Sequence, residues 1–177
     1  MMSASHAAPH ATPFNPALDL RLERTLEVTP TMLWRAYTDP ALLKQWFCPK
    51  PWTTVDAEID PRPGGIFRTT MQSPEGQQFP NLGCFLEAVP NQTIVWTNAL
   101  LPGFRPAPVN APCGDEAVEF MFTARIEFAA HGAQGTLYRA TVTHADEKGC
   151  QQHAAMGFEA GWGAALDQLE ALAKKGF

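Results

Sequence analysis

The chain has 177 residues, of which 45% are hydrophobic and 18% are charged, and its formal net charge at pH 7 is −5. This length and composition are typical of one globular domain, large enough to fold without a metal or disulfide. The negative charge and the lack of a basic run exclude a nonspecific nucleic-acid-binding protein, and the longest apolar runs are too short to span a bilayer.

The first residues, rich in Ala, Pro and His, lack the basic start and continuous apolar core of a secretory signal peptide. We expect a disordered or extended lead-in at residues 1–18 and a single domain at residues 19–177. The cysteines are irregularly spaced and form no CxxC pair: Cys48, Cys84, Cys113 and Cys150. We therefore expect free thiols, a cytoplasmic location, and neither a metal nor a cofactor.

The first predicted element is a strand over residues 19–28, where leucines alternate with charged side chains. Thr29 and Asp39 each stand directly before a proline, so each can cap a helix whose first residue is that proline. We therefore expect two short helices after the first strand.

Six further strands are predicted from alternating apolar residues, at 54–60, 66–72, 82–89, 93–99, 118–128 and 136–144. In the first of these, Val55, Ala57 and Ile59 are expected to face the core, while the acidic side chains between them face solvent. Short turns join most of these segments, which favours antiparallel pairing.

Residues 100–117 contain four prolines, which fit neither a central strand nor a helix interior. This segment is predicted to be a long proline-rich loop. Loops of this length often serve as lids over binding sites, and otherwise they are disordered insertions.

The last predicted element is one long helix over residues 147–174, capped by Asp146 and carrying a broad apolar stripe. Gly157, Gly161 and Gly163 reduce helix propensity, so we expect them to permit close packing on the sheet or a bend near a cavity mouth. The order of elements predicts an α+β fold, in which a curved antiparallel sheet wraps around the long C-terminal helix. Such an arrangement leaves a natural ligand cavity between sheet and helix.

Four segments carry a resemblance to a known family: DPALLKQWF at 39–47, RPGGIFR at 62–68, FLEAVPNQTIVWT at 85–97 and GFEAGWGAALDQLEALA at 157–173. The sequence is similar to the START-like (SRPBCC) superfamily, and within it to the group related to the C-terminal domain of the activator of the heat-shock-protein-90 ATPase. The resemblance runs from about Leu20 to Ala173, and its most specific motif is Gly161-Trp162-Gly163 with the leucines that follow.

This resemblance implies the helix-grip fold, with two short helices after the first strand and a cavity beneath the C-terminal helix. Members of the superfamily are similar to lipid carriers, polyketide cyclases, hormone receptors and co-chaperones. We do not expect the separate N-terminal domain that the eukaryotic activator uses on its chaperone, and therefore we do not expect direct activation of a chaperone.

Inward-facing aromatic and flexible apolar side chains indicate a binding site, although an ordinary core role is the simpler explanation for most of them. The expected ligand-binding residues are Phe67, Met71, Trp96, Asn98, Phe120, Phe122, Tyr138, His153 and Met156. Arg68 is a further polar candidate, but the preferred register places Phe67 inside the sheet and Arg68 outside.

Other chemistry has weaker support. Cys150 and His153 are three positions apart on one helix face and, with His144, can in principle hold zinc, but the simpler interpretation is an ordinary helix start beside a pocket. The acidic side chains of residues 54–60 are interpreted as a solvated sheet face. The serines are not placed for nucleophilic catalysis.

We therefore predict a domain that binds a small hydrophobic or aromatic molecule between the sheet and the C-terminal helix. One alternative is an enzyme of the polyketide cyclase or aromatase type, in which Tyr138 or His153 would move protons. Another is a chaperone-associated protein-interaction domain. We expect no nucleic-acid or membrane partner, and the sequence leaves open whether the protein is a homodimer.

Overall fold

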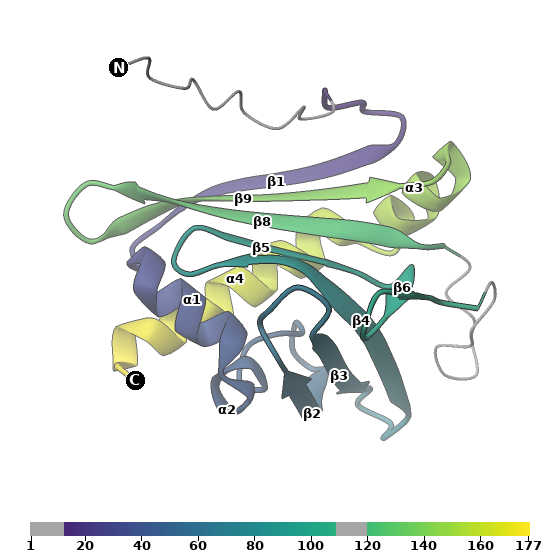
Figure 1. The fold of residues 1–177 in the computed structure, drawn as a ribbon. Helices are drawn as coiled ribbons and strands as arrows, with labels where there is room; N and C mark the ends of the chain where they lie inside the picture. Colours follow the sequence, from purple (N-terminus) through teal and green to yellow (C-terminus); the bar gives the residue numbers. More distant parts are fainter. Residues whose placement is uncertain (1–12, 109–119) are drawn as a thin grey trace, which may run out of the picture.

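The computed structural model describes residues 13–108 and 120–177, and it contains one large curved sheet (Figure 1). Its seven strands are β1 (Asp19–Leu26), β2 (Thr53–Ile59), β3 (Ile66–Gln72), β4 (Gln78–Val89), β5 (Thr93–Thr97), β8 (Phe122–His131) and β9 (Gly135–His144). All neighbours are antiparallel, in the order β1-β9-β8-β5-β4-β3-β2. The strands predicted from alternation are therefore confirmed, with end points that differ by a few residues.

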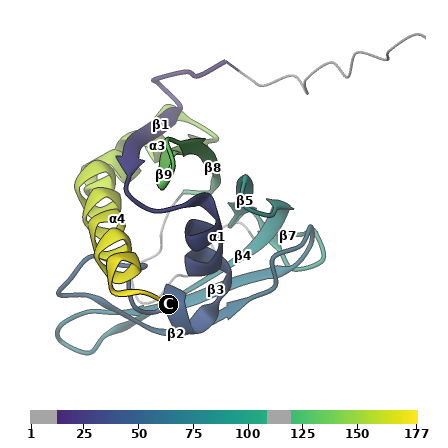
Figure 2. The same ribbon diagram turned by 90° about the vertical axis from the view of Figure 1, so that its left-hand side faces the viewer.

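The helices are α1 (Pro30–Thr38), α2 (Pro40–Leu43), α3 (Glu147–Ala155) and α4 (Phe158–Lys175). Figure 2 shows the sheet curling from β1 round to β2, with α1 and α4 on its inner side. The α+β helix-grip fold is thus confirmed. Within the described residues, no helix is both long and apolar enough to cross a membrane.

The predicted caps form as their sequences require. The Thr29 hydroxyl accepts a hydrogen bond from the backbone N–H of Met32 at 3.3 Å. The Asp39 carboxylate accepts one from the N–H of Ala41 at 2.8 Å. These caps satisfy N–H groups that have no partner within the helix, and so they fix where α1 and α2 begin.

The single C-terminal helix predicted from the sequence is wrong in one respect, because the helix is interrupted between α3 and α4. Gly157 adopts a left-handed conformation with φ of 89°, which ends the first helical segment and starts the second. Gly163, by contrast, packs closely: a Cβ there would lie 2.8 Å from the Arg24 guanidinium nitrogen Nη2. Gly157 therefore permits the turn between the two helices, and Gly163 permits close packing.

The expected inward orientation of Val55 is also wrong. The register of β2 against β3 shifts between Thr54 and Asp56, so Val55 lies in a bulge and its side chain is 39% exposed. Beyond the bulge, Asp56 and Glu58 pair with Arg68 on the outer face, at 2.6 and 3.0 Å. The preferred register, with Phe67 inside and Arg68 outside, is confirmed.

The proline-rich segment 100–117 is not a loop throughout. Its first part forms a small hairpin of β6 (Leu100–Leu101) and β7 (Arg105–Pro106). Residues 109–117 lie outside the described residues, and they include Cys113 and half of the candidate lid. Residues 118–119 and the first twelve residues of the predicted lead-in also lie outside the described residues.

Candidate functional site

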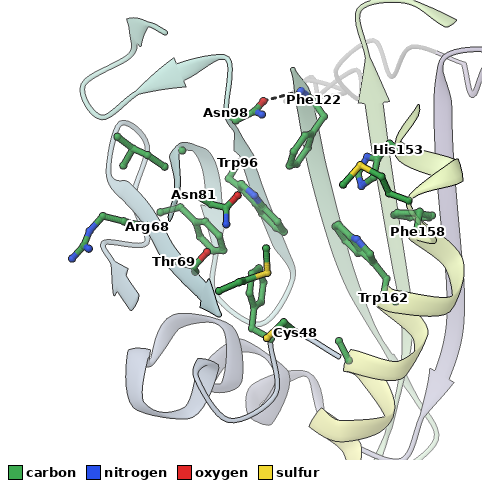
Figure 3. Close-up of a pocket in the computed structure, with 18 of the residues that line it drawn as sticks. Cys48, Arg68, Thr69, Asn81, Trp96, Asn98, Phe122, His153, Phe158 and Trp162 are labelled. Atoms are coloured by element: carbon green, nitrogen blue, oxygen red, sulfur yellow. Dashed lines mark hydrogen bonds between the residues drawn. The ribbon is translucent and has the colours of Figure 1, made fainter. Parts of the chain in front are cut away.

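A pocket of about 770 Å³ lies between the inner face of the sheet and the helices (Figure 3). All nine residues predicted to bind a ligand line it: Phe67, Met71, Trp96, Asn98, Phe120, Phe122, Tyr138, His153 and Met156. They come from β3, β5, the start of β8, β9 and the α3 region, so the curvature of the sheet brings them together. That they bind a ligand stays a prediction.

The middle of the pocket is bounded by two parallel indole rings. Trp96 on β5 and Trp162 on α4 have ring planes 3° apart and centroids 6.4 Å apart. Phe67 stacks on Trp96, with centroids 4.7 Å apart. Figure 3 shows the two tryptophans facing the pocket from the sheet side and the helix side. The pocket therefore presents flat aromatic surfaces from opposite walls.

Tyr138, the first candidate for proton transfer, has its hydroxyl 2.7 Å from that of Tyr37 on α1. Both side chains are buried, and desolvation raises the pKa of each hydroxyl above its ordinary value. Each hydroxyl is therefore neutral at physiological pH and already hydrogen-bonded within the protein. This arrangement makes Tyr138 a poor proton donor to a ligand.

His153, the second candidate, belongs to a chain of hydrogen bonds. Its Nδ1 lies 3.0 Å from Nε2 of His144, and Nδ1 of His144 lies 2.9 Å from the Leu18 carbonyl oxygen. The ring of His153 also stacks on Phe120, with centroids 5.0 Å apart. The chain fixes both the position and the orientation of the imidazole at the pocket wall.

Burial and the neighbouring imidazole together hold His153 neutral. Desolvation, followed by the electrostatic effect of His144, lowers the pKa of His153 from 6.5 to about 4. A base with so low a pKa removes protons weakly at neutral pH. It remains able to accept a hydrogen bond.

Asn98 lines the pocket, but its amide is engaged by the neighbouring strand. Its carbonyl oxygen accepts a hydrogen bond from the Phe122 N–H at 2.8 Å, and its NH₂ group donates to the Phe120 carbonyl at 3.4 Å. These bonds hold the start of β8 against the end of β5. The amide thus has a structural role whatever the pocket contains.

Thr69 was missed by the sequence analysis, although strand alternation could have indicated it. It lies two residues after Phe67 and two before Met71, on the same inner face of β3. Its side chain is 1% exposed, and Oγ1 has no hydrogen-bond partner among the described residues. An unpaired buried hydroxyl at a pocket wall is a candidate ligand contact.

The described lining carries little charge. Arg68 is its one residue with a formal charge at neutral pH, and that guanidinium is turned outward to Asp56 and Glu58 (Figure 3). His144, Cys150 and His153 do not come together as a metal site. Within 13–108 and 120–177, no three His, Cys, Asp or Glu side chains are grouped to hold a metal ion.

The end of the pocket near α1 and α2 was also not predicted. It is lined by Tyr37, Trp46, Phe47 and Cys48. The Trp46 indole N–H donates to the Ala36 carbonyl at 3.1 Å, and its ring packs edge-on against Tyr37 at 4.8 Å. The buried side chains of α1 are Leu33, Ala36 and Tyr37, and the sequence did not reveal which part of the sheet this face of the helix would cover.

Comparison with protein families gives a match over residues 27–174 to "Activator of Hsp90 ATPase homolog 1-like protein". This range includes most of the pocket-lining elements. A comparison with curated proteins found no match.

Solved structures with the same fold include a protein of Nitrosomonas europaea, which is 42% identical with a TM-score of 0.83. The match covers 92% of this chain and 97% of that one. A protein of Rhodobacter sphaeroides is 20% identical with a TM-score of 0.74, covering 94% and 97% of the two chains. A protein of Mycobacterium smegmatis is 22% identical with a TM-score of 0.69, covering 89% and 91%. The last two similarities show the fold alone.

Proposed function

Because this chain belongs to the Activator of Hsp90 ATPase homolog 1-like family, whose fold is consistent with ligand-binding domains, we propose that its pocket binds a small aromatic molecule. The pocket volume of about 770 Å³ falls within the range of roughly 300–1,000 Å³ that is usual for small-molecule sites. Its walls are mainly aromatic and aliphatic, with a few polar atoms, which is also usual for such sites.

The observation that carries this proposal is the parallel arrangement of Trp96 and Trp162. A flat ring in contact with both indoles needs about 7 Å between them, since carbon atoms in contact are about 3.5 Å apart. The observed centroid separation of 6.4 Å is the upper limit of the spacing between the two parallel planes, so a ring can enter only if one tryptophan moves outward. Aromatic rings on both faces add stacking to the burial of apolar surface.

The test uses N-phenyl-1-naphthylamine, an uncharged aromatic probe whose fluorescence rises in apolar surroundings. We expect saturable binding to the wild-type protein, and at least tenfold weaker binding to Trp96→Ala and Trp162→Ala. Trp52→Ala is the matched control, because Trp52 packs on Phe79 and is not among the residues that line the pocket.

Circular dichroism should show that all three variants keep the wild-type fold. Absence of saturable binding to the wild type would contradict the proposal. An equal loss of affinity in Trp52→Ala would place the bound probe outside the pocket, and it would contradict the proposal as well.

A further inference from the structure

Two polar atoms on different walls of the pocket have no partner among the described residues. One is Oγ1 of Thr69 on β3, and the other is Nε2 of His153 on α3, whose Nδ1 is bonded to His144. Figure 3 shows Thr69 and His153 on either side of Trp96 and Trp162. The pocket therefore has one unpaired polar atom on its sheet side and one on its helix side.

The hydrogen bonds decide which kind of polar group His153 presents. The Leu18 carbonyl can only accept, so Nδ1 of His144 carries a hydrogen. With that hydrogen on Nδ1, Nε2 of His144 is the atom left to accept the 3.0 Å bond from Nδ1–H of His153. Neutral His153 consequently has a lone pair at Nε2, which calls for a hydrogen-bond donor on the ligand.

The charge of the lining restricts the ligand further. Arg68 is the one formally charged residue of the described lining, and it is paired with Asp56 and Glu58 on the outer face. An ionised ligand would therefore be desolvated among aromatic rings without a counter-charge, which is strongly unfavourable. These surroundings favour an uncharged molecule.

Building on the aromatic-ligand function above, we propose that the ligand is an uncharged aromatic alcohol or phenol whose O–H donates to Nε2 of His153. A second oxygen at its other end hydrogen-bonds Oγ1 of Thr69. The hydroxyl of Thr69 both donates and accepts, so it suits either a carbonyl or a second hydroxyl. His153, which accepts only, sets the requirement for a donor.

Isothermal titration calorimetry with a matched series of naphthalenes tests the donor requirement. We expect 2-naphthol to bind the wild type about tenfold more tightly than 2-methoxynaphthalene, which lacks the O–H, and more tightly still than anionic 2-naphthoate. In His153→Phe the ratio of the affinities for 2-naphthol and 2-methoxynaphthalene should fall to about one. In His131→Gln, at the exposed end of β8, the ratio should stay at its wild-type value.

The contact with Thr69 is tested with 2,6-dihydroxynaphthalene. Its second hydroxyl should raise affinity over 2-naphthol several-fold in the wild type, and this gain should disappear in the isosteric Thr69→Val variant. If 2,6-dihydroxynaphthalene gains nothing in the wild type, or if the gain persists in Thr69→Val, the proposed second contact is wrong.

The possible outcomes separate the two proposals. If none of the naphthalenes binds, the aromatic-ligand function fails, and this inference fails with it. If all of them bind with equal affinity, the function stands and the donor requirement is wrong.

A nitrogen NMR spectrum of the wild-type histidines checks the tautomer of His153 without any substitution. We expect hydrogen on Nδ1 of His153. Hydrogen on Nε2 would overturn the inference, even if His153→Phe does not fold.

Discussion

Tyr37 on α1 and Tyr138 on β9 are 101 positions apart in the sequence, and their hydroxyl oxygens lie 2.7 Å apart in the buried interior. One hydroxyl donates and the other accepts, so each buried hydroxyl satisfies its partner. Both side chains also line the pocket. This bond therefore ties the first helix to the sheet at the wall of the candidate site.

Removing either hydroxyl of this pair should destabilise the fold. Tyr37→Phe and Tyr138→Phe should each lower the free energy of unfolding by about 1–3 kcal/mol, because the remaining hydroxyl is left buried and unpaired. The double variant should be no less stable than either single variant, since it leaves no unpaired hydroxyl. Urea denaturation measures all four proteins, and strictly additive losses would contradict this account.

The depressed pKa of His153 predicts a loss of stability in mild acid. The pKa of this imidazole is about 4 in the folded protein and ordinarily 6.5, so the unfolded chain takes up the proton first as the pH falls. The contribution of neutral His153 to the free energy of unfolding is complete above about pH 6.5. It decreases as the pH falls from about 6.5 to 4, and below pH 4 it changes no further. At ~1.4 kcal/mol per pKa unit, the loss approaches about 3 kcal/mol.

Carboxylates also titrate in this pH range, so the effect must be read as a difference between variants. The free energy of unfolding of wild type minus that of His153→Phe should fall from pH 7 to pH 4. His131→Gln, which changes an exposed histidine, should show the wild-type dependence throughout. A difference between wild type and His153→Phe that is independent of pH would refute the burial of a neutral imidazole.

Much of the fold is predictable from short-range patterns. Alternating residues define the strands, and Thr29 and Asp39 mark helix starts because their side chains satisfy free N–H groups. The bulge at Val55 was not predicted, because a strand that alternates on both sides of a bulge gives no sign of it. A bend was one of the two roles considered for the glycines of the C-terminal helix, but the sequence did not show that Gly157 is the one that interrupts the helix.

The candidate site was predictable in its apolar part and much less so in its polar part. Alternation shows that Phe67 and Trp96 face inward, and both line the pocket. It does not show which polar groups find partners. Asn98 is engaged by the β8 backbone, whereas the hydroxyl of Thr69 is left unpaired, and this difference depends on contacts that are distant in the sequence.

The glycines of the C-terminal helices should respond in opposite directions to alanine. Gly157→Ala should lower the free energy of unfolding by about 1–2 kcal/mol, because alanine disfavours the left-handed conformation at φ of 89°. Gly161→Ala should raise it by up to about 1 kcal/mol, since a Cβ there meets only Pro49 Cγ at 3.9 Å. Thermal unfolding measures both variants, and a stabilising Gly157→Ala would argue against the interruption.

The unpaired hydroxyl of Thr69 predicts a substitution that stabilises the free protein. Thr69→Val keeps the shape of the side chain and removes a buried group without a partner, so the free energy of unfolding should rise by about 1 kcal/mol. Thr136→Val is the matched control. The Thr136 hydroxyl donates to the Val28 carbonyl at 2.6 Å, and its removal should cost about 1–3 kcal/mol.

Chemical denaturation of the ligand-free variants measures both effects. If Thr69→Val destabilises the protein as much as Thr136→Val does, the Thr69 hydroxyl has a partner within the fold and is not kept for a ligand. If it stabilises the free protein but weakens binding of 2,6-dihydroxynaphthalene, stability and binding make opposite demands on this one atom. Such a conflict is expected where a binding site retains a polar group that folding alone disfavours.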